Sequence, residues 1–220
     1  MFSTAMLQMM FTGFLETLYM TLGATLMAYV LGIPIGLFLV ITDKGGIRPL
    51  PTAYRLVGGA VNILRSIPFL ILLVWVVPVT RFIVGTAIGS TATIVPLVIA
   101  AAPYVARVVE SALKEVDQGV LEAAQAMGAG TMQMITKVLL PEAKPSLLLG
   151  AAISTTVILG YSAMAGIVGG GGLGAIAINY GYYRSQSDVM LVMIIVLVII
   201  VQIIQEHGNF VTRKSDRRIH

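Results

Sequence analysis

Five long apolar stretches constrain this chain more than any other feature of its sequence. A helix needs about 20 mostly apolar residues to cross a bilayer, and only helices and closed barrels satisfy every backbone polar group there. The chain is 57% hydrophobic and 11% charged, with a mean hydropathy of +0.93, whereas soluble domains carry about 25% charged residues. The sequence therefore predicts an all-α integral membrane protein with five transmembrane helices in a single domain over residues 1–220. The predicted spans cover about residues 17–41, 56–79, 91–110, 145–164 and 189–205.

The rest of the composition excludes several classes of protein. The sequence contains no Cys, so it has neither a disulfide framework nor a thiolate metal site. A net charge of +4 does not indicate nucleic-acid binding, because basic residues in a membrane protein usually set its orientation. We expect no cleavable signal peptide, because the N-terminus lacks a basic region and its apolar run continues too far.

The distribution of Lys and Arg predicts the orientation of the chain in the membrane. With the N-terminus outside, Arg81 and Arg184 are the outer basic residues, and Arg65 and Arg107 fall within spans. The basic residues then inside are Lys44, Arg48, Arg55, Lys114, Lys137, Lys144, Arg213, Lys214, Arg217 and Arg218. Because cytoplasmic loops carry the excess of positive residues, we expect a cytoplasmic C-terminus, with a basic tail over residues 208–220.

The segment of about residues 117–141 is neither a membrane span nor a short loop. It reads as two short helices that are broken at Gly128-Ala129-Gly130, because glycine at a helix end accepts the left-handed conformation. Thr131 is expected to cap the second helix. Pro141 cannot continue the hydrogen bonding of that helix, so it should mark the start of a new element.

The spacing within this segment resembles the EAA loop of ABC importer permeases. The matching positions are Glu122, Ala123, Ala124, Gly128, Val138, Leu140 and Pro141. Seven fixed positions at set spacing seldom arise by accident; an ordinary Ala-rich helical hairpin is the alternative. In that family the loop forms a coupling helix that sits in a cleft of a separate ATPase subunit. The resemblance therefore implies a cytoplasmic ATPase-coupling segment over about residues 117–141.

No nucleotide site is predicted in this chain. The P-loop pattern G-x-x-x-x-G-K followed by Ser or Thr does not occur, so ATP with Mg²⁺ would be bound by a partner ATPase and this chain would be neither an enzyme nor a cofactor carrier. Gly169–Gly174 matches G-x-G-x-x-G only formally, since a dinucleotide site needs a preceding strand. We interpret it as a hinge or a close-packing element, which glycine permits. In related permeases the equivalent stretch lies near the periplasmic gate.

Several residues of the spans and of the Gly-rich loop are candidates for the transport path or its gate. They are Asn62, Arg65, Ser66, Tyr161, Ser162, Met164, Gly169, Gly172 and Gly174. Small and hydroxylated residues also join membrane helices, so packing is the alternative role. Arg107 lies three residues before Glu110, so these two should pair on one helix face. Arg65 could snorkel toward the inside or pair across helices.

Few titratable groups lie deep in the predicted spans. Proton-coupled carriers generally need buried carboxylates or histidines as relays. Glu16 and Asp188 lie near span ends, and His207 and His220 lie beyond or at the end of the last span. An autonomous secondary carrier, the rival from another class, is therefore disfavoured.

Beyond the EAA loop, the sequence resembles the methionine-importer permeases. The residues that carry the resemblance are Arg65–Trp75, Val77-Pro78, Thr80-Arg81, Val84–Thr86, Gly160–Met164 and the Gly-rich loop. One departure lies at Gly130-Thr131, where relatives often have a hydroxyl residue and proline. It implies a homodimer in the bacterial inner membrane with a periplasmic N-terminus, two ATPase subunits, and a periplasmic or lipoprotein binding protein that delivers L- or D-methionine. Transport would proceed by alternating access. A permease for a polar amino acid or an osmoprotectant is the rival of the same class.

Overall fold

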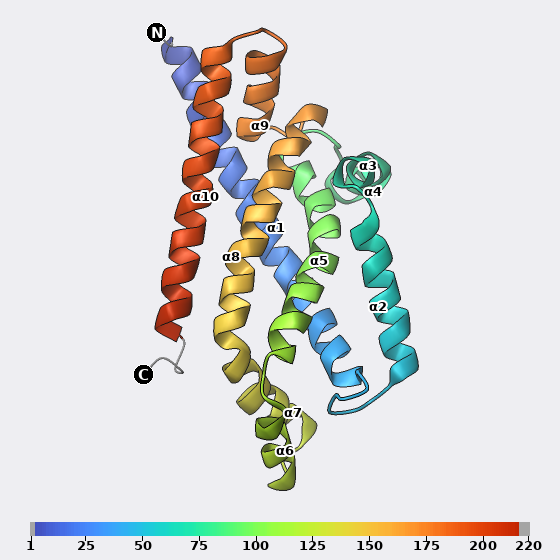
Figure 1. Ribbon diagram of the computed structural model, residues 1–220. Coiled ribbons are helices and arrows are strands. Elements are labelled where there is room, and N and C mark those ends of the chain that lie inside the picture. Colours follow the sequence, from blue (N-terminus) through green and yellow to red (C-terminus); the bar gives the residue numbers. More distant parts are fainter. Residues whose placement is uncertain (1–2, 216–220) are drawn as a thin grey trace. The chain divides into compact units, whose positions relative to one another are not determined.

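The computed structural model describes residues 3–215, and all regular secondary structure within that part of the chain is helical (Figure 1). The elements are α1 (Thr4–Thr42), α2 (Pro51–Ser66), α3 (Phe69–Trp75), α4 (Val77–Val84), α5 (Ser90–Lys114), α6 (Gln118–Ala126), α7 (Thr131–Gln133), the π-helix η1 (Met134–Leu139), α8 (Leu140–Ala165), the 3₁₀-helix η2 (Gly166–Val168), α9 (Gly172–Ile176), the π-helix η3 (Ala177–Tyr182) and α10 (Ser187–Ser215). Arg217, Arg218 and His220 of the predicted basic tail lie outside the described residues.

The predicted fold class is confirmed. Four helical stretches are long and apolar enough to cross a membrane, namely α1, α5, the stretch Thr131–Val168, and α10. The bent pair α2 and α3 counts as a fifth span if it crosses as one unit. α1 begins at Thr4, so the helix also contains the apolar residues that precede the predicted span 17–41.

The second predicted span, residues 56–79, is not one continuous helix. α2 ends at Ser66 and α3 begins at Phe69, and the chain bends sharply between them. Pro68 has φ −58° and ψ 133°, and the residue before a proline is pushed out of the α region. Hydropathy alone registers the apolar residues and misses this break, which separates α3 and α4 from α2.

Pro141 does not begin a new element, contrary to the sequence-based expectation. η1 leads directly into α8, and the helical backbone continues through Pro141 and Pro145. Pro141 is the second residue of α8 and directly follows the π-helix η1, where the regular i→i−4 hydrogen bonding is already interrupted. Pro145 has no N–H to donate to the Pro141 carbonyl. Because Pro141 is exposed, that carbonyl can accept a hydrogen bond from another partner. The fourth helix therefore starts before residue 145, where the predicted span began.

The chain forms two compact units. Unit 1 comprises Met1–Ala28, Ile67–Ala101 and Thr155–Gln205, and unit 2 comprises Tyr29–Ser66, Ala102–Ser154 and Glu206–His220.

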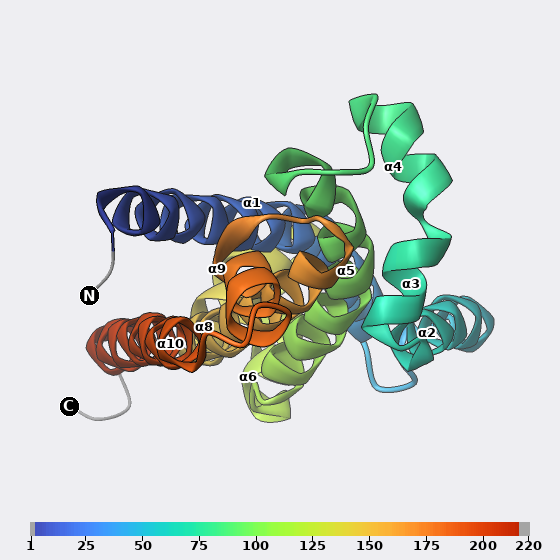
Figure 2. The same cartoon turned by 90° about the horizontal axis from the view of Figure 1, so that it is seen from above.

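Unit 1 is organised around an apolar cluster supplied by α1, α8, α9, η3 and α10. Figure 2 labels α1, α8, α9 and α10. Its buried members are Met10, Leu159, Leu173, Ile176, Ala177, Val189, Met193 and Ile200. α9 lies so close to α8 that a Cβ on Gly174 would collide with the carbonyl oxygen of Ala163. This agrees with a close-packing role for the Gly-rich loop.

Unit 2 is built on the close contact of the second part of α1 with α5. A Cβ on Gly32 would lie 2.6 Å from Val105 Cγ1, and one on Gly36 would lie 2.6 Å from the carbonyl oxygen of Ala106. Small residues four positions apart let two membrane helices approach closely. Leu39, also on α1, is fully buried in this unit. The α1–α5 pair positions the ends of both helices, next to which the predicted coupling segment begins.

Candidate functional site

The first half of the predicted coupling segment is α6, which begins and ends as its sequence indicates. The Asp117 carboxylate caps the helix by accepting the Gly119 N–H at 2.7 Å, a stabilising N-cap. After Ala126 the chain turns at Gly128, whose φ is +81°, and the Gly128 and Ala129 N–H groups donate to the carbonyls of Gln125 and Ala124 at 2.9 and 3.1 Å. The predicted helix break at Gly128 is therefore present.

The second half begins differently from the prediction. Gly130, not Thr131, occupies the N-cap position of α7, and Thr131 is the first helical residue. The Gln133 side chain accepts the Gly130 N–H at 2.9 Å. The correction has a local cause, because this side chain reaches back to the first turn as the residue three positions after a cap commonly does.

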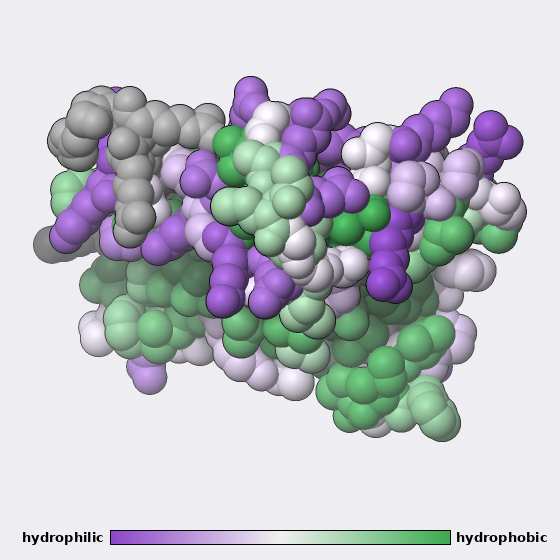
Figure 3. Space-filling model, turned by 90° about the horizontal axis from the view of Figure 1, so that it is seen from below, coloured by the Kyte–Doolittle hydropathy of each residue, from purple (hydrophilic) through white to green (hydrophobic). Residues whose placement is uncertain are grey.

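The seven EAA positions divide into buried and exposed groups. Ala124 is buried, Val138 and Leu140 are half-buried, and the others are exposed. The segment also exposes large apolar side chains, with Met127 at 83% and Met132 at 69%. Seen from the side on which α6 and α7 lie, hydrophilic side chains are numerous at the surface (Figure 3). Exposed apolar groups with a polar surround are typical of an interaction site.

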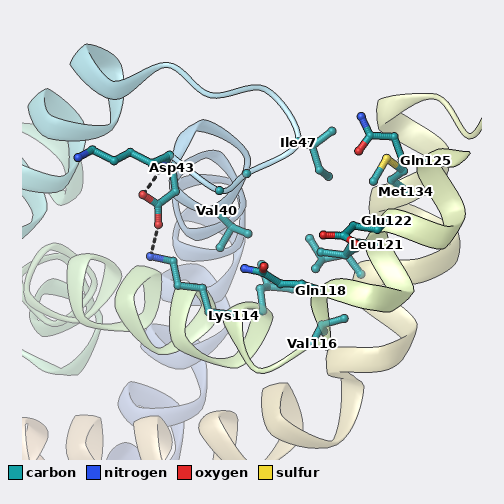
Figure 4. A pocket seen from close by; sticks show the side chains of 15 residues that line it. Val40, Asp43, Ile47, Lys114, Val116, Gln118, Leu121, Glu122, Gln125 and Met134 are labelled. Atoms are coloured by element: carbon teal, nitrogen blue, oxygen red, sulfur yellow. Dashed lines mark hydrogen bonds and ion pairs between the residues drawn. The ribbon is translucent and has the colours of Figure 1, made fainter.

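A cavity of about 530 Å³ lies beside α6 in unit 2. Gln118, Glu122 and Gln125 line it from α6, and Asp43 and Lys114 line it from the ends of α1 and α5 (Figure 4). Positions four and three residues apart share one face of a helix. The polar face of α6, including Glu122 of the motif, therefore borders open space.

A network of charged groups lies at the end of α5, and the sequence predicted only part of it. The predicted pair is confirmed, with Arg107 Nη1 at 2.5 Å from Glu110 Oε2. Lys114 Nζ lies 2.9 Å from Glu110 Oε1 and 2.6 Å from Asp43 Oδ2. Tyr54 donates its hydroxyl to Glu110 at 3.0 Å. The (i, i+4) spacing of Glu110 and Lys114 was available as a signal, but nothing local pointed to Asp43 or Tyr54.

This network fixes three segments of unit 2 to one another. Glu110 is only 4% exposed, and Arg107 also donates to the Gly58 carbonyl at 2.8 Å, so α2 is joined to α5. The hydrogen bond from Lys114 lowers the pKa of the Asp43 carboxyl below its ordinary value of 3.8, against the opposing effect of burial. α5 is thus joined both to α2 and to the loop that follows α1. These contacts lie near the end of α5, directly before the coupling segment in the sequence.

The candidate path residues of unit 2 contact their neighbours through polar groups. The Arg65 guanidinium lies 5.8 Å from the centre of the Tyr104 ring, so it interacts across helices. Ser66 donates to the Asn62 carbonyl at 2.8 Å within α2. All three candidates, Asn62, Arg65 and Ser66, are exposed.

The candidate residues of α8 in unit 1 include one aromatic contact. Tyr161 stacks on Phe69 with ring centres 4.6 Å apart, and Ser162 is buried and donates to the Leu159 carbonyl at 2.8 Å. Met164 is half exposed. Tyr161 and Ser162 therefore have packing contacts of their own, as the alternative reading allowed.

The Gly-rich loop is fixed by backbone hydrogen bonds on two sides. From α1, Glu16 accepts the Gly172 N–H at 2.7 Å and Thr17 accepts the Leu173 N–H at 2.9 Å. Near the start of α5, the Gly89 N–H donates to the Gly169 carbonyl at 2.9 Å. Sequence reasoning placed Glu16 near a span end but did not connect it with this loop. Glu16 and Thr17 position Gly172, and Gly174 packs on α8.

The described residues 3–215 contain no group of three His, Cys, Asp or Glu side chains placed to hold a metal ion.

Comparisons with known proteins agree with these features. A family described as binding-protein-dependent transport system inner membrane component matches residues 32–214. The probable D-methionine transport system permease protein MetI of Vibrio cholerae is 50% identical over 96% of this chain and 93% of its own length. The corresponding protein of Haemophilus influenzae is 45% identical over 94% of this chain and 97% of its own length.

A solved structure supports the same assignment. A chain of the MetNI methionine ABC transporter in an inward-facing conformation superposes with a TM-score of 0.97 at 48% identity, covering 98% of this chain and all of the other. An amino acid ABC transporter crystallised with histidines has a TM-score of 0.78 at 19% identity over 94% of both chains, which shows the shared fold. With a family match over most of its length, this chain belongs to the binding-protein-dependent transport system inner membrane components, the multi-pass permeases of ABC transporters.

Proposed function

We propose that this chain is the permease subunit of an ATP-driven importer that carries methionine, as the L or the D enantiomer, across the bacterial inner membrane. The observation that carries the proposal is the near-full-length similarity, at about half identity, to permeases named for D-methionine transport. The structural similarity to a methionine ABC transporter supports it. The transport reaction is movement without covalent change, so this chain needs neither a catalytic residue nor a cofactor.

The coupling segment is the proposed contact with the ATPase. Glu122, Ala123 and Gly128 are exposed on it, and the exposed side chains of Met127 and Met132 provide adaptable apolar surface. ATP with Mg²⁺ would be bound by the ATPase, and a displacement of α6 would act on the end of α5. The less exposed positions of the motif, Ala124, Val138 and Leu140, hold α6 against η1. Pro141 lies in the first residues of α8.

The charge network beside α6 should make the adjoining ends of α1, α2 and α5 rigid, so that a displacement of α6 moves them together. A buried ion pair that loses one partner leaves an uncompensated charge, which costs about 3–5 kcal/mol. Arg107 and Lys114 should therefore move with the buried Glu110 rather than separate from it. The ends of α1, α2 and α5 would respond as one body when the ATPase closes.

The proposed assembly has two copies of this chain, two ATPase subunits on the cytoplasmic side, and a periplasmic or lipoprotein binding protein. The proposed orientation has a periplasmic N-terminus and a cytoplasmic C-terminus, supported by the excess of Lys and Arg in the loops assigned to the inside. The chain would act as a single transmembrane domain in alternating access. Gly169, Gly172 and Gly174 would belong to the periplasmic gate, and Asn62, Arg65, Ser66, Tyr161, Ser162 and Met164 to the path.

Reconstitution tests this function. The chain is co-expressed with the ATPase encoded beside it, purified as a complex in mild detergent and placed in liposomes with the binding protein. We expect methionine uptake that depends on ATP and on the binding protein. A stable complex that imports another solute would replace methionine as the substrate. Transport by the chain alone, driven by an ion gradient, would replace the ABC mechanism itself.

A further inference from the structure

Unit 1 contains a cavity of about 160 Å³ between α3, α4, the start of α5 and the Gly-rich loop. α3, α4 and α5 are labelled in Figure 2. Its wall is mainly apolar and includes Leu73, Val74, Val77, Ala92 and Pro96. An apolar cavity of about 150 Å³ is large enough to bind benzene, so a ligand side chain of about four to six heavy atoms would fit here.

The polar side chains in the wall are already hydrogen-bonded within the protein. Thr80 donates its hydroxyl to the Val76 carbonyl at 3.2 Å. Thr93 lies 2.9 Å from the Gly89 carbonyl and 3.4 Å from that of Gly170. Both hydroxyl groups therefore have acceptors in the backbone. A polar ligand side chain would lose its hydrogen bonds to water without replacement, which is costly, so the wall favours an apolar one.

Arg81 is the one charged residue among the described residues that line this cavity. The ion pairs observed between residues 3 and 215 all lie in unit 2, and none involves Arg81. The other basic residue of unit 1, Arg184, lies with its guanidinium 4.3 Å from the centre of the Tyr180 ring. A guanidinium offers parallel N–H donors that match a carboxylate. An exposed Arg beside an apolar cavity therefore complements an apolar molecule that carries a carboxylate.

We propose that Arg81 and this cavity bind an apolar α-amino acid on its way through the permease. The carboxylate lies on the Arg81 guanidinium, and the side chain enters the cavity between Val77 and Ala92. The inference rests on the proposed import of methionine and names a contact site for it. Methionine fits because its thioether chain is unbranched and adaptable.

The chemistry of the wall also sets the stereochemical selectivity. The described lining residues include no Asp or Glu, so the ammonium group of the ligand remains in water. Without an ion pair to the ammonium group, the site contacts the ligand only at its carboxylate and its side chain. Two such contacts do not distinguish the L from the D enantiomer. L-methionine, D-methionine and norleucine should therefore all bind, whereas glutamine and methioninol, which lacks a carboxylate, should not.

Cysteine protection tests the site directly, because the natural sequence contains no Cys. Val77→Cys places a thiol in the cavity wall of the assembled transporter complex, and mass spectrometry follows its labelling by a small methanethiosulfonate reagent. We expect L-methionine, D-methionine and norleucine to slow labelling several-fold, and glutamine and methioninol to have no effect. Phe82→Cys is the matched control, because Phe82 lies on the same helix, is 91% exposed and does not line the cavity.

A second substitution links the protection to the charge. Arg81→Gln in the Val77→Cys background should abolish protection, while Arg184→Gln should preserve it. Protection that survives Arg81→Gln, labelling that no apolar amino acid slows, or a thiol that never reacts would each overturn the proposal. If Val77→Cys prevents assembly, Val74→Cys provides a thiol in the same wall.

Two further measurements distinguish a failure of this binding site from a failure of the proposed function and from a role of Arg81 in docking the substrate-binding protein. If the unsubstituted complex imports methionine but methionine does not protect the Val77→Cys thiol, only the binding site is overturned. If the unsubstituted complex does not import methionine at all, the proposed function is overturned. Arg81→Gln could instead weaken the binding of the substrate-binding protein, measured by its Kd for the complex. A raised Kd with intact protection would assign Arg81 to that docking surface and overturn the ligand site.

Discussion

Units 1 and 2 are held together by different interactions. By sequence, unit 2 contains 12 of the 14 Lys and Arg residues and 8 of the 10 Asp and Glu residues, and unit 1 contains only Glu16, Arg81, Arg184 and Asp188. The observed ion pairs join Asp43, Arg107, Glu110 and Lys114, all of unit 2. Unit 1 relies on an apolar cluster and on backbone hydrogen bonds to the Gly-rich loop.

The difference suggests different mechanical behaviour for the two units. Ion pairs that are partly buried resist separation, because each charge left alone is costly. Apolar contacts are non-directional, so helices can slide on one another without leaving a charge unpaired. Unit 2 is therefore suited to transmit a displacement from α6 without deforming. Unit 1 is suited to change its packing around the Gly-rich loop.

The largest expected effect comes from removing the central charge of unit 2. Glu110→Gln removes the buried carboxylate that Arg107 and Lys114 share, although Lys114 keeps Asp43 and both cations are partly exposed. We therefore expect a loss of about 2–3 kcal/mol in stability. Thermal unfolding of the purified complex measures the loss. Glu206→Gln, which removes an equal charge from an exposed position of unit 2, should leave the Tm unchanged. Equal Tm values for the two variants would show that the network does not hold unit 2 together.

The matching test of unit 1 adds a single methyl group. Gly174→Ala places a Cβ against the backbone of Ala163, and overpacking of this kind costs about 1–3 kcal/mol. Gly160→Ala adds the same methyl where no heavy atom of a neighbour lies within 4 Å, and there the helix should gain about 0.5–1 kcal/mol. Opposite shifts in Tm are expected. Shifts of the same sign would contradict the close-packing role of the loop.

Sequence reasoning succeeded where the cause was local. The break at Gly128 and the Arg107–Glu110 pair each depend on residues a few positions apart, so spacing and residue type were sufficient. It failed at Pro68 and Pro141, because the same residue type coincides with a break between α2 and α3 but is accommodated after the π-helix η1.

The contacts that position the candidate site were beyond any local signal. Asp43 meets Lys114 only because α1 and α5 pack closely through Gly32 and Gly36. Glu16 reaches the Gly172 N–H across 156 positions of sequence. Hydropathy identifies which helices enter the membrane, but the pairing of their ends depends on tertiary packing that one sequence does not specify.

A third prediction concerns the turn within the coupling segment of unit 2. Gly128→Val places a branched side chain at a φ of +81°, where a non-glycine residue costs about 1–2 kcal/mol. We expect the complex to assemble and hydrolyse ATP while uptake per ATP falls. Gly128→Asn is the matched control, because Asn enters the left-handed region more readily. Normal coupling in the Val variant would remove this turn from the mechanical path.

The smallest expected effect comes from Asp43, the partly exposed member of the charge network of unit 2, in contrast to the buried Glu110. The pKa of Asp43 is lowered in the folded chain, so its contribution to stability is complete above its ordinary value of 3.8 and is lost as the pH falls through the lower folded value. Because Asp43 is 28% exposed, the contribution should stay below about 1 kcal/mol. Asp43→Asn should therefore lower the Tm slightly at pH 7 and approach the unsubstituted Tm in acid.

The pH dependence is what identifies the ion pair as the cause. Glu206→Gln removes the same charge from an exposed position of α10 and should leave the Tm at pH 7 unchanged. A Tm difference for Asp43→Asn that is constant with pH would indicate lost packing in the loop after α1 instead of a lost charge. In that case the rigidity of unit 2 would rest on Glu110 and its helix-borne partners alone, and the loop would be free to follow α6 rather than restrain it.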